Sequence, residues 1–141
     1  MGPASGISGE VTLASGASTA GNSGHLSLSS GVAQQGKGGM IHGAVGSGNA
    51  GSGGDFIVNA GESSDVQSGG TIEITTGAST MTSSGSLSVS TSDAGLSGVS
   101  GGMNVQSGKA TGGDSGSISV FTGQAVGGKA GMIGMAVGSG D

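Results

Sequence analysis

The chain has 141 residues, of which 36 are Gly and only 3 are Lys or Arg, and its net charge is −5 at pH 7. So few basic residues exclude a basic nucleic-acid-binding surface, and the absence of Cys excludes disulfides and thiol chemistry. Leu, Ile, Val and Phe contribute only 25 residues, which excludes a conventional globular core. No apolar run approaches the roughly 18 residues of a membrane span. In chain order, residues 1–7 are expected to form a lead-in segment or a cloning remnant.

A repeat of 15 residues begins at Ser8 and continues to the end of the chain. Its second position is Gly in all nine units, at intervals of 15 or 16 residues. These glycines are Gly9, Gly24, Gly39, Gly54, Gly70, Gly85, Gly101, Gly116 and Gly131. Position 4 is apolar in every unit and position 6 in every unit except the third, where it is Gly43. Such regularity overrides the compositional signature of a disordered chain.

A longer period lies above the 15-residue repeat. Residues 5–49 align without gaps to residues 97–141, and 23 of the 45 aligned positions are identical. The offset of 92 residues equals six units plus two single-residue insertions, near Ser68 and Val99. The sequence therefore consists of about one and a half copies of a six-unit super-repeat, and we expect residues 8–141 to form a single domain of nine units.

Positions 3–8 of each unit alternate in polarity, which predicts a strand with one face inward. Gly at positions 2 and 9 suits a corner or a close backbone approach. A 15-residue unit is too short for a βαβ motif, which needs about 30 residues, but it fits one coil of a solenoid. The predicted fold class is all-β, a parallel β-solenoid (β-helix) of about nine coils of 15 residues, with unassigned handedness. Position 6, as at Val89, is expected to lie in a narrow, dry interior.

The repeated pattern of Ser or Gly, then Gly, then two apolar residues separated by one residue resembles the Gly/Ser-rich parallel β-solenoid repeats of surface and adhesin-like proteins. The resemblance covers residues 5–141. The 15-residue period also resembles antifreeze β-helices, which present columns of Thr on a flat strand face. Here Thr71 and Thr75 flank Glu73, and no neighbouring unit repeats that pattern.

No catalytic, cofactor-binding or metal-binding residues are predicted. Four of the acidic residues, Asp55, Asp65, Asp93 and Asp114, occupy four different repeat positions, so no pair of carboxylates for glycan cleavage is recognisable. The two imidazoles, His25 and His42, lie on adjacent units at positions 3 and 5, and are interpreted as solvated surface residues. We therefore expect neither an enzyme nor a cofactor.

Four large apolar residues fall on outward positions of a small, polar face and form a candidate association surface. They are Met40, Ile57, Phe121 and Met132. Met40 and Ile57 are expected on neighbouring coils, as are Phe121 and Met132. The expected partners are further copies of the chain, or neighbouring coils of a longer chain, and not nucleic acid or a spanned membrane.

The expected function is that of a structural rod or spacer segment, which associates with itself, within a longer extracellular or cell-surface repeat protein such as a fibre or an adhesin stalk. A super-repeat favours this reading because spacers grow by duplication. The alternative is binding of ice or a glycan on a flat strand face, although the outward positions keep no constant residue type.

Overall fold

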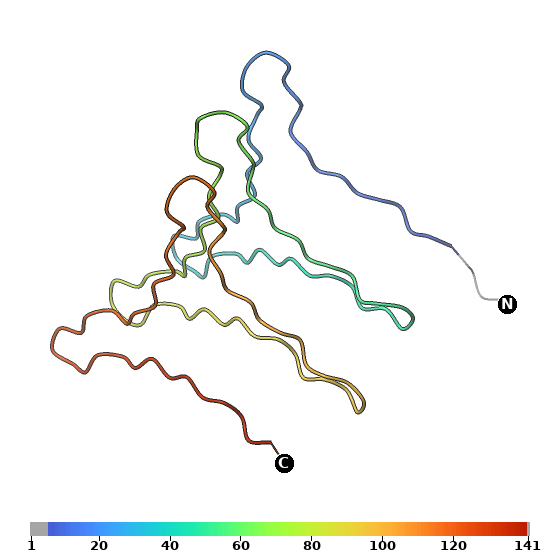
Figure 1. Ribbon diagram of the computed structural model, residues 1–141. Coiled ribbons are helices and arrows are strands. Elements are labelled where there is room, and N and C mark those ends of the chain that lie inside the picture. The colour runs from blue at the N-terminus through green and yellow to red at the C-terminus, as the bar shows by residue number, and fades with distance from the viewer. Residues whose placement is uncertain (1–5, 141) are drawn as a thin grey trace. The chain divides into compact units, whose positions relative to one another are not determined.

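The computed structural model describes residues 6–140, so Asp141 and residues 1–5 of the expected lead-in lie outside the described part (Figure 1). Within residues 6–140 the backbone contains no helix and no strand. It consists of extended segments joined by regularly spaced bends. The chain groups into two units, Met1–Glu73 and Ile74–Asp141. The boundary between them falls inside the fifth repeat.

The expectation of a parallel β-solenoid, or β-helix, is wrong. A parallel ladder would set each residue beside its equivalent in the next repeat, about 15 residues along the chain. In the described residues no such ladder forms, and the recurring close approaches join residues only 8–10 apart. Two backbone hydrogen bonds connect described residues, Gly70 N–H to the Gly61 carbonyl and Gly85 N–H to the Gly77 carbonyl, both 2.9 Å. Each of them closes a local chain reversal.

The element that recurs is a neck, defined here as the contact between position 8 of one repeat and the position-2 glycine of the next. A Cβ placed on each of these glycines would lie 2.8–3.8 Å from the position-8 side chain. The necks pair Ser15 with Gly24, Ser30 with Gly39, Val45 with Gly54, Ala60 with Gly70, Thr76 with Gly85, Thr91 with Gly101, Ser107 with Gly116, and Thr122 with Gly131. Gly is needed at position 2 because a larger residue would push the two segments apart.

The two segments that meet at a neck run in opposite directions. At the third neck, Val45 approaches Gly54, and two residues further from the bend the Phe56 ring lies 3.6 Å from where a Cβ on Gly43 would be. Stepping back along one segment while stepping forward along the other is the register of an antiparallel pair. Figure 1 shows the chain doubling back at each bend.

This register brings the apolar positions of the repeat opposite one another. Position 6 of each unit stands opposite position 4 of the next, one alternate residue further from the bend than the neck. The pairs in register are Leu13 and Leu26, Leu28 and Ile41, Gly43 and Phe56, Val58 and Ile72, Ile74 and Leu87, Val89 and Met103, Val105 and Ile118, and Val120 and Ile133. The smallest residue at position 6, Gly43, thus faces the largest at position 4, Phe56.

A loop of eight or nine residues closes each neck, and its bend falls at repeat positions 12–15. The bends occupy residues 19–21, 34–36, 49–52, 65–67, 80–82, 96–98, 111–113 and 126–128. The inserted residues Ser68 and Val99 lengthen two loops and leave the necks in place. Gly21, Gly51 and Gly127 reverse the chain with positive φ, at 133°, 76° and 80°.

No residue between 6 and 140 is buried, and only Ser63 and Thr76 are partly covered. Position 4 is 50–62% exposed in most repeats, whereas Val11 in the first repeat is 95% exposed. The expected dry interior at position 6 is therefore wrong, since Val89 is 71% exposed. The necks shield one apolar face in part and do not build a core.

Candidate functional site

The outward positions 3, 5 and 7 of each repeat share one side of the segment, which we call the outer face. Two hydrogen bonds join residues two apart on this face. Thr12 Oγ1 donates to Glu10 Oε1 at 2.8 Å, and Asn104 Nδ2 donates to Gln106 Oε1 at 3.5 Å. Contacts at a spacing of two are those of an extended segment whose side chains alternate between faces. The alternation in the sequence therefore survives locally even though no ladder forms.

Phe121 and Met132 lie directly opposite each other on the outer face. The ideal Cβ of Gly131 is 3.3 Å from Thr122 Cγ2, and Phe121 and Met132 are each one residue further from the bend. Their side chains are 81% and 89% exposed. Two large apolar side chains therefore meet beside this neck without a covering group from the described chain.

Met40 and Ile57 are placed differently. Met40 stands opposite Ser29 in the register of the second neck, whereas Ile57 stands opposite His42 in the register of the third. Their side chains are 83% and 73% exposed. Because Met40 and His42 are two residues apart on one face, Ile57 is a diagonal neighbour of Met40 and not its direct partner.

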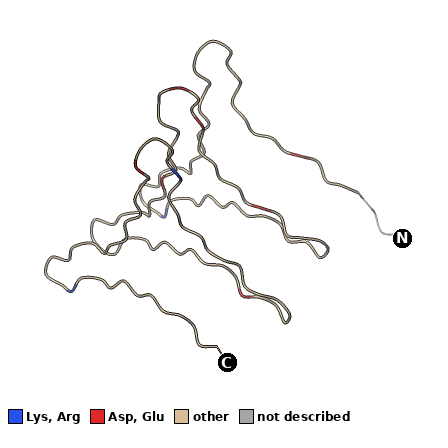
Figure 2. Ribbon diagram, in the orientation of Figure 1, with Lys and Arg blue, Asp and Glu red and all other residues tan. Residues whose placement is uncertain are grey.

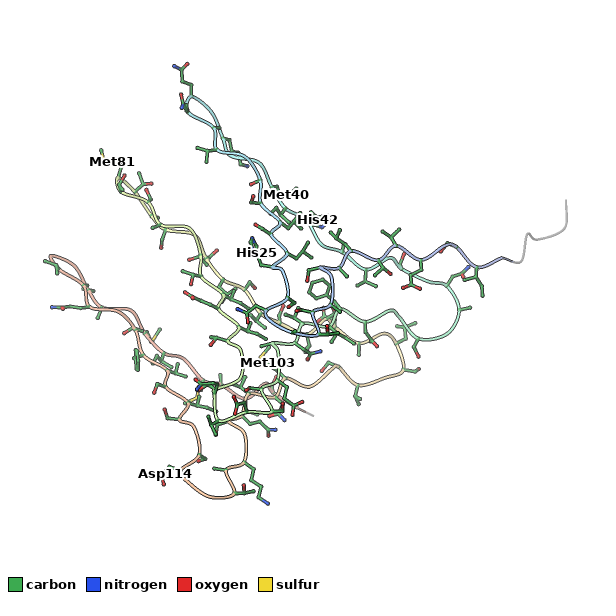
Figure 3. All side chains as sticks on the ribbon, turned by 90° about the horizontal axis from the view of Figure 1, so that it is seen from above. His25, Met40, His42, Met81, Met103 and Asp114 are labelled. Atoms are coloured by element: carbon green, nitrogen blue, oxygen red, sulfur yellow. The ribbon has the colours of Figure 1, made fainter. Side chains whose placement is uncertain are left out.

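The two histidines come from the segments that the second neck joins. Ser30 Oγ donates to the Gly39 carbonyl at 3.0 Å, which fixes that neck. Figure 3 shows His25, Met40 and His42 in the same part of the first unit. Within the described chain no three His, Cys, Asp or Glu side chains gather closely enough to hold a metal ion. The two imidazoles thus lack the further ligand that a metal site of these residue types requires.

The charged side chains are dispersed, and most of them lie on the loops beyond the necks (Figure 2). Lys37, Glu62, Asp93, Lys109 and Asp114 are among these loop residues. No pocket is found over the part of the chain that the structure describes. The absence of a catalytic site stays a prediction from the sequence.

The flat strand face needed by the ice-binding and glycan-binding alternative does not form in residues 6–140, because these residues contain no strand. Thr71 and Thr75, the best match to a Thr column, lie on a single segment. In the described residues there is also no helix with the length and apolar character to cross a membrane.

Sequence reasoning missed the neck residues as the positions that organise the molecule. Position 8 was read as an inward strand residue, and its contact with the next glycine was not foreseen. One signal was available in the third and fourth units, where the only Gly at position 6 precedes the only Phe at position 4. Compensating sizes at Gly43 and Phe56 indicate that these two positions face each other, as the structure places them.

Comparison with protein-family models, with curated proteins and with solved structures finds no match to this chain.

Proposed function

We propose that this chain is a structural repeat segment, a rod-like spacer within a longer extracellular or cell-surface protein. The observation that supports the proposal most directly is the neck, which recurs at all eight junctions between repeats. Each junction joins only consecutive repeats, so a repeat can be added without rebuilding those already present. Modular addition of this kind is what a spacer needs.

The distribution of constant and variable positions supports the same role. Position 2 is always Gly and position 4 always apolar, and both belong to the necks or to the apolar pairs beside them. The outer face, by contrast, changes from Glu10 in the first repeat to His25 in the second and Met40 in the third. The repeat thus keeps the residues that join its units and varies those that a regular ligand array would have to keep.

The experiment is a length series studied by small-angle X-ray scattering. A second copy of residues 50–141 is appended after Asp141, which extends the chain by one super-repeat of 92 residues to 233. A spacer whose length grows with the number of repeats increases its radius of gyration by about 1.65-fold, against about 1.2-fold for a compact domain and about 1.35-fold for an unfolded chain. The matched control appends the same 92 residues in shuffled order.

We expect the repeat extension to approach the linear value and the shuffled extension to fall below it. A ratio at or below that of an unfolded chain for the repeat extension overturns the proposal. So does an equal ratio for the repeat and shuffled extensions, because the repeat pattern would then contribute nothing to reach.

A further inference from the structure

We propose that a second copy of this chain docks on the outer face of the eighth neck, with Phe121 and Met132 at the centre of the contact. This face is made of residues 117, 119 and 121 on one segment and 132, 134 and 136 on the other. The inference rests on the proposed structural role and names the partner of that segment. The partner is another copy of the same outer face.

The eighth neck differs from the others in what lies beside it. At each neck, position 7 of one repeat stands opposite position 3 of the next on the outer face. The pairs in register are Ala14 and His25, Ser29 and Met40, Ala44 and Asp55, Asn59 and Thr71, Thr75 and Ser86, Ser90 and Gly102, Gln106 and Ser117, and Phe121 and Met132. Only the last pair brings together two large apolar side chains. Both are more than four-fifths exposed, as an unoccupied contact surface requires.

Charge favours a second copy as the occupant. When identical faces meet, every charge approaches a like charge, so a contact between copies is favourable only on a face without charges. The outer face at the eighth neck has none, because Phe121 and Met132 are accompanied by Ser117, Ser119 and residues 134 and 136, which are Gly and Ala. The face around Ile57 includes Asp55 and His42, so two copies of that face would repel each other more strongly.

The available area sets the strength of the contact. Phe and Met side chains at this exposure offer about 300 Å² per copy, and the small residues of the face add to it. A stable interface buries about 800 Å² per partner. The contact is therefore weak and reversible in solution, and it gains strength where several copies lie in register along a longer chain.

Sedimentation equilibrium of the intact chain, read by interference optics because Trp and Tyr are absent, tests the contact. We expect a concentration-dependent dimer. The double variant Phe121→Ser with Met132→Ser should lower the association constant at least about tenfold. Ser is the residue that the first copy of the super-repeat has at Ser29, the equivalent of Phe121, so the change at that position keeps to what the repeat itself uses.

The matched control is Met40→Ser with Ile57→Ser, which removes two equally exposed apolar residues beside charged groups and should leave association unchanged. A monomeric wild-type chain at all concentrations overturns the inference, as does an equal loss of association in both double variants. A dimer that survives Phe121→Ser with Met132→Ser overturns it too.

Failure of this inference can be told apart from failure of the proposed function. The scattering ratio of the repeat extension is measured again with Phe121→Ser and Met132→Ser in place. A near-linear ratio without dimerisation of the wild type rejects the docking face alone. Dimerisation of the wild type together with a compact ratio rejects the spacer.

Discussion

At the residue scale, the glycines at repeat positions 2 and 9 do different things. A Cβ on the position-2 glycines meets the preceding repeat, whereas a Cβ on position-9 glycines such as Gly46 and Gly31 meets nothing within 4 Å. The sequence treats the two positions alike, because both are almost always Gly. Close approach therefore explains position 2, and it does not explain position 9, where neither a contact nor a positive φ is present.

Replacing Gly54 by Ala should open the third neck. The new Cβ would lie 2.8 Å from Val45 Cγ1, so either the side chain or the backbone must move. In Gly46→Ala the new methyl group meets open space, and reduced freedom of the unfolded chain stabilises it by about 0.4–1 kcal/mol. We expect the NOEs between residue 54 and the Val45 methyl groups to disappear in Gly54→Ala and to persist in Gly46→Ala. Equal NOEs in the two variants would contradict the neck.

Amide exchange should distinguish the two necks that contain backbone hydrogen bonds. Gly70 N–H and Gly85 N–H each donate to a carbonyl at 2.9 Å. A hydrogen bond of this kind contributes about 0.5–1.5 kcal/mol net, which corresponds to roughly two- to tenfold slower exchange. We expect this slowing at Gly70 and Gly85 relative to Gly46 and Gly31 in hydrogen-exchange NMR. Uniform exchange at all four amides would show that neither bond persists in solution.

At the element scale, the loops reverse the chain by two different devices. Some use the positive φ of Gly, as at Gly51. The loop around residue 80 has no Gly at its bend and uses Ser79 instead. The Ser79 hydroxyl oxygen accepts from Thr82 N–H at 2.9 Å and from Met81 N–H at 3.3 Å, and it lies 3.1 Å from Thr82 Oγ1. A side chain that accepts from the backbone two or three residues on replaces a backbone turn.

Replacing Ser79 by Ala should loosen this bend, because Met81 and Thr82 lose a common acceptor. Ser79→Asp keeps an acceptor in the same place and should retain the bend. We expect the Thr82 amide to exchange about two- to tenfold faster in Ser79→Ala and at the original rate in Ser79→Asp. The neighbouring Ser83→Ala change is the control. An unchanged Thr82 amide in Ser79→Ala would leave the bend without its proposed support.

Much of the repeat's organisation could be predicted from the sequence, but the direction of pairing could not. The period, the alternation of faces and the need for Gly at position 2 all follow from residue types. Parallel and antiparallel arrangements place the same apolar positions opposite one another, since position 4 can face position 4 or position 6 of the next unit. Only a size mismatch such as that of Gly43 and Phe56 separates the two, and it occurs once. On the candidate surface, Phe121 and Met132 were expected on neighbouring coils, but the antiparallel register that sets them opposite each other was not foreseen.

At the scale of the whole molecule, the chain keeps most of its surface in contact with water. Its accessible area is 14319 Å². A compact protein of 12.8 kDa exposes about 6300 Å², and the same chain fully unfolded exposes about 18600 Å². Apolar side chains that remain at least half exposed supply only part of their burial energy, while Gly-rich segments are costly to order. The repeats are therefore held by local necks and by whatever covers their apolar pairs.

This surface determines how the isolated chain should respond to urea. The denaturant m-value scales with the area exposed on unfolding, and here about 4300 Å² is exposed against about 12300 Å² for a compact domain of this mass. We expect an m-value about a third of that of a compact 141-residue domain, with a broad transition because each neck opens independently. Amide chemical shifts of the Phe121→Ser, Met132→Ser chain, followed through a urea titration, measure this without a contribution from association. A single steep transition shared by residues in all repeats would mean that the necks open together, and the repeats would then depend on one another far more than their contacts indicate.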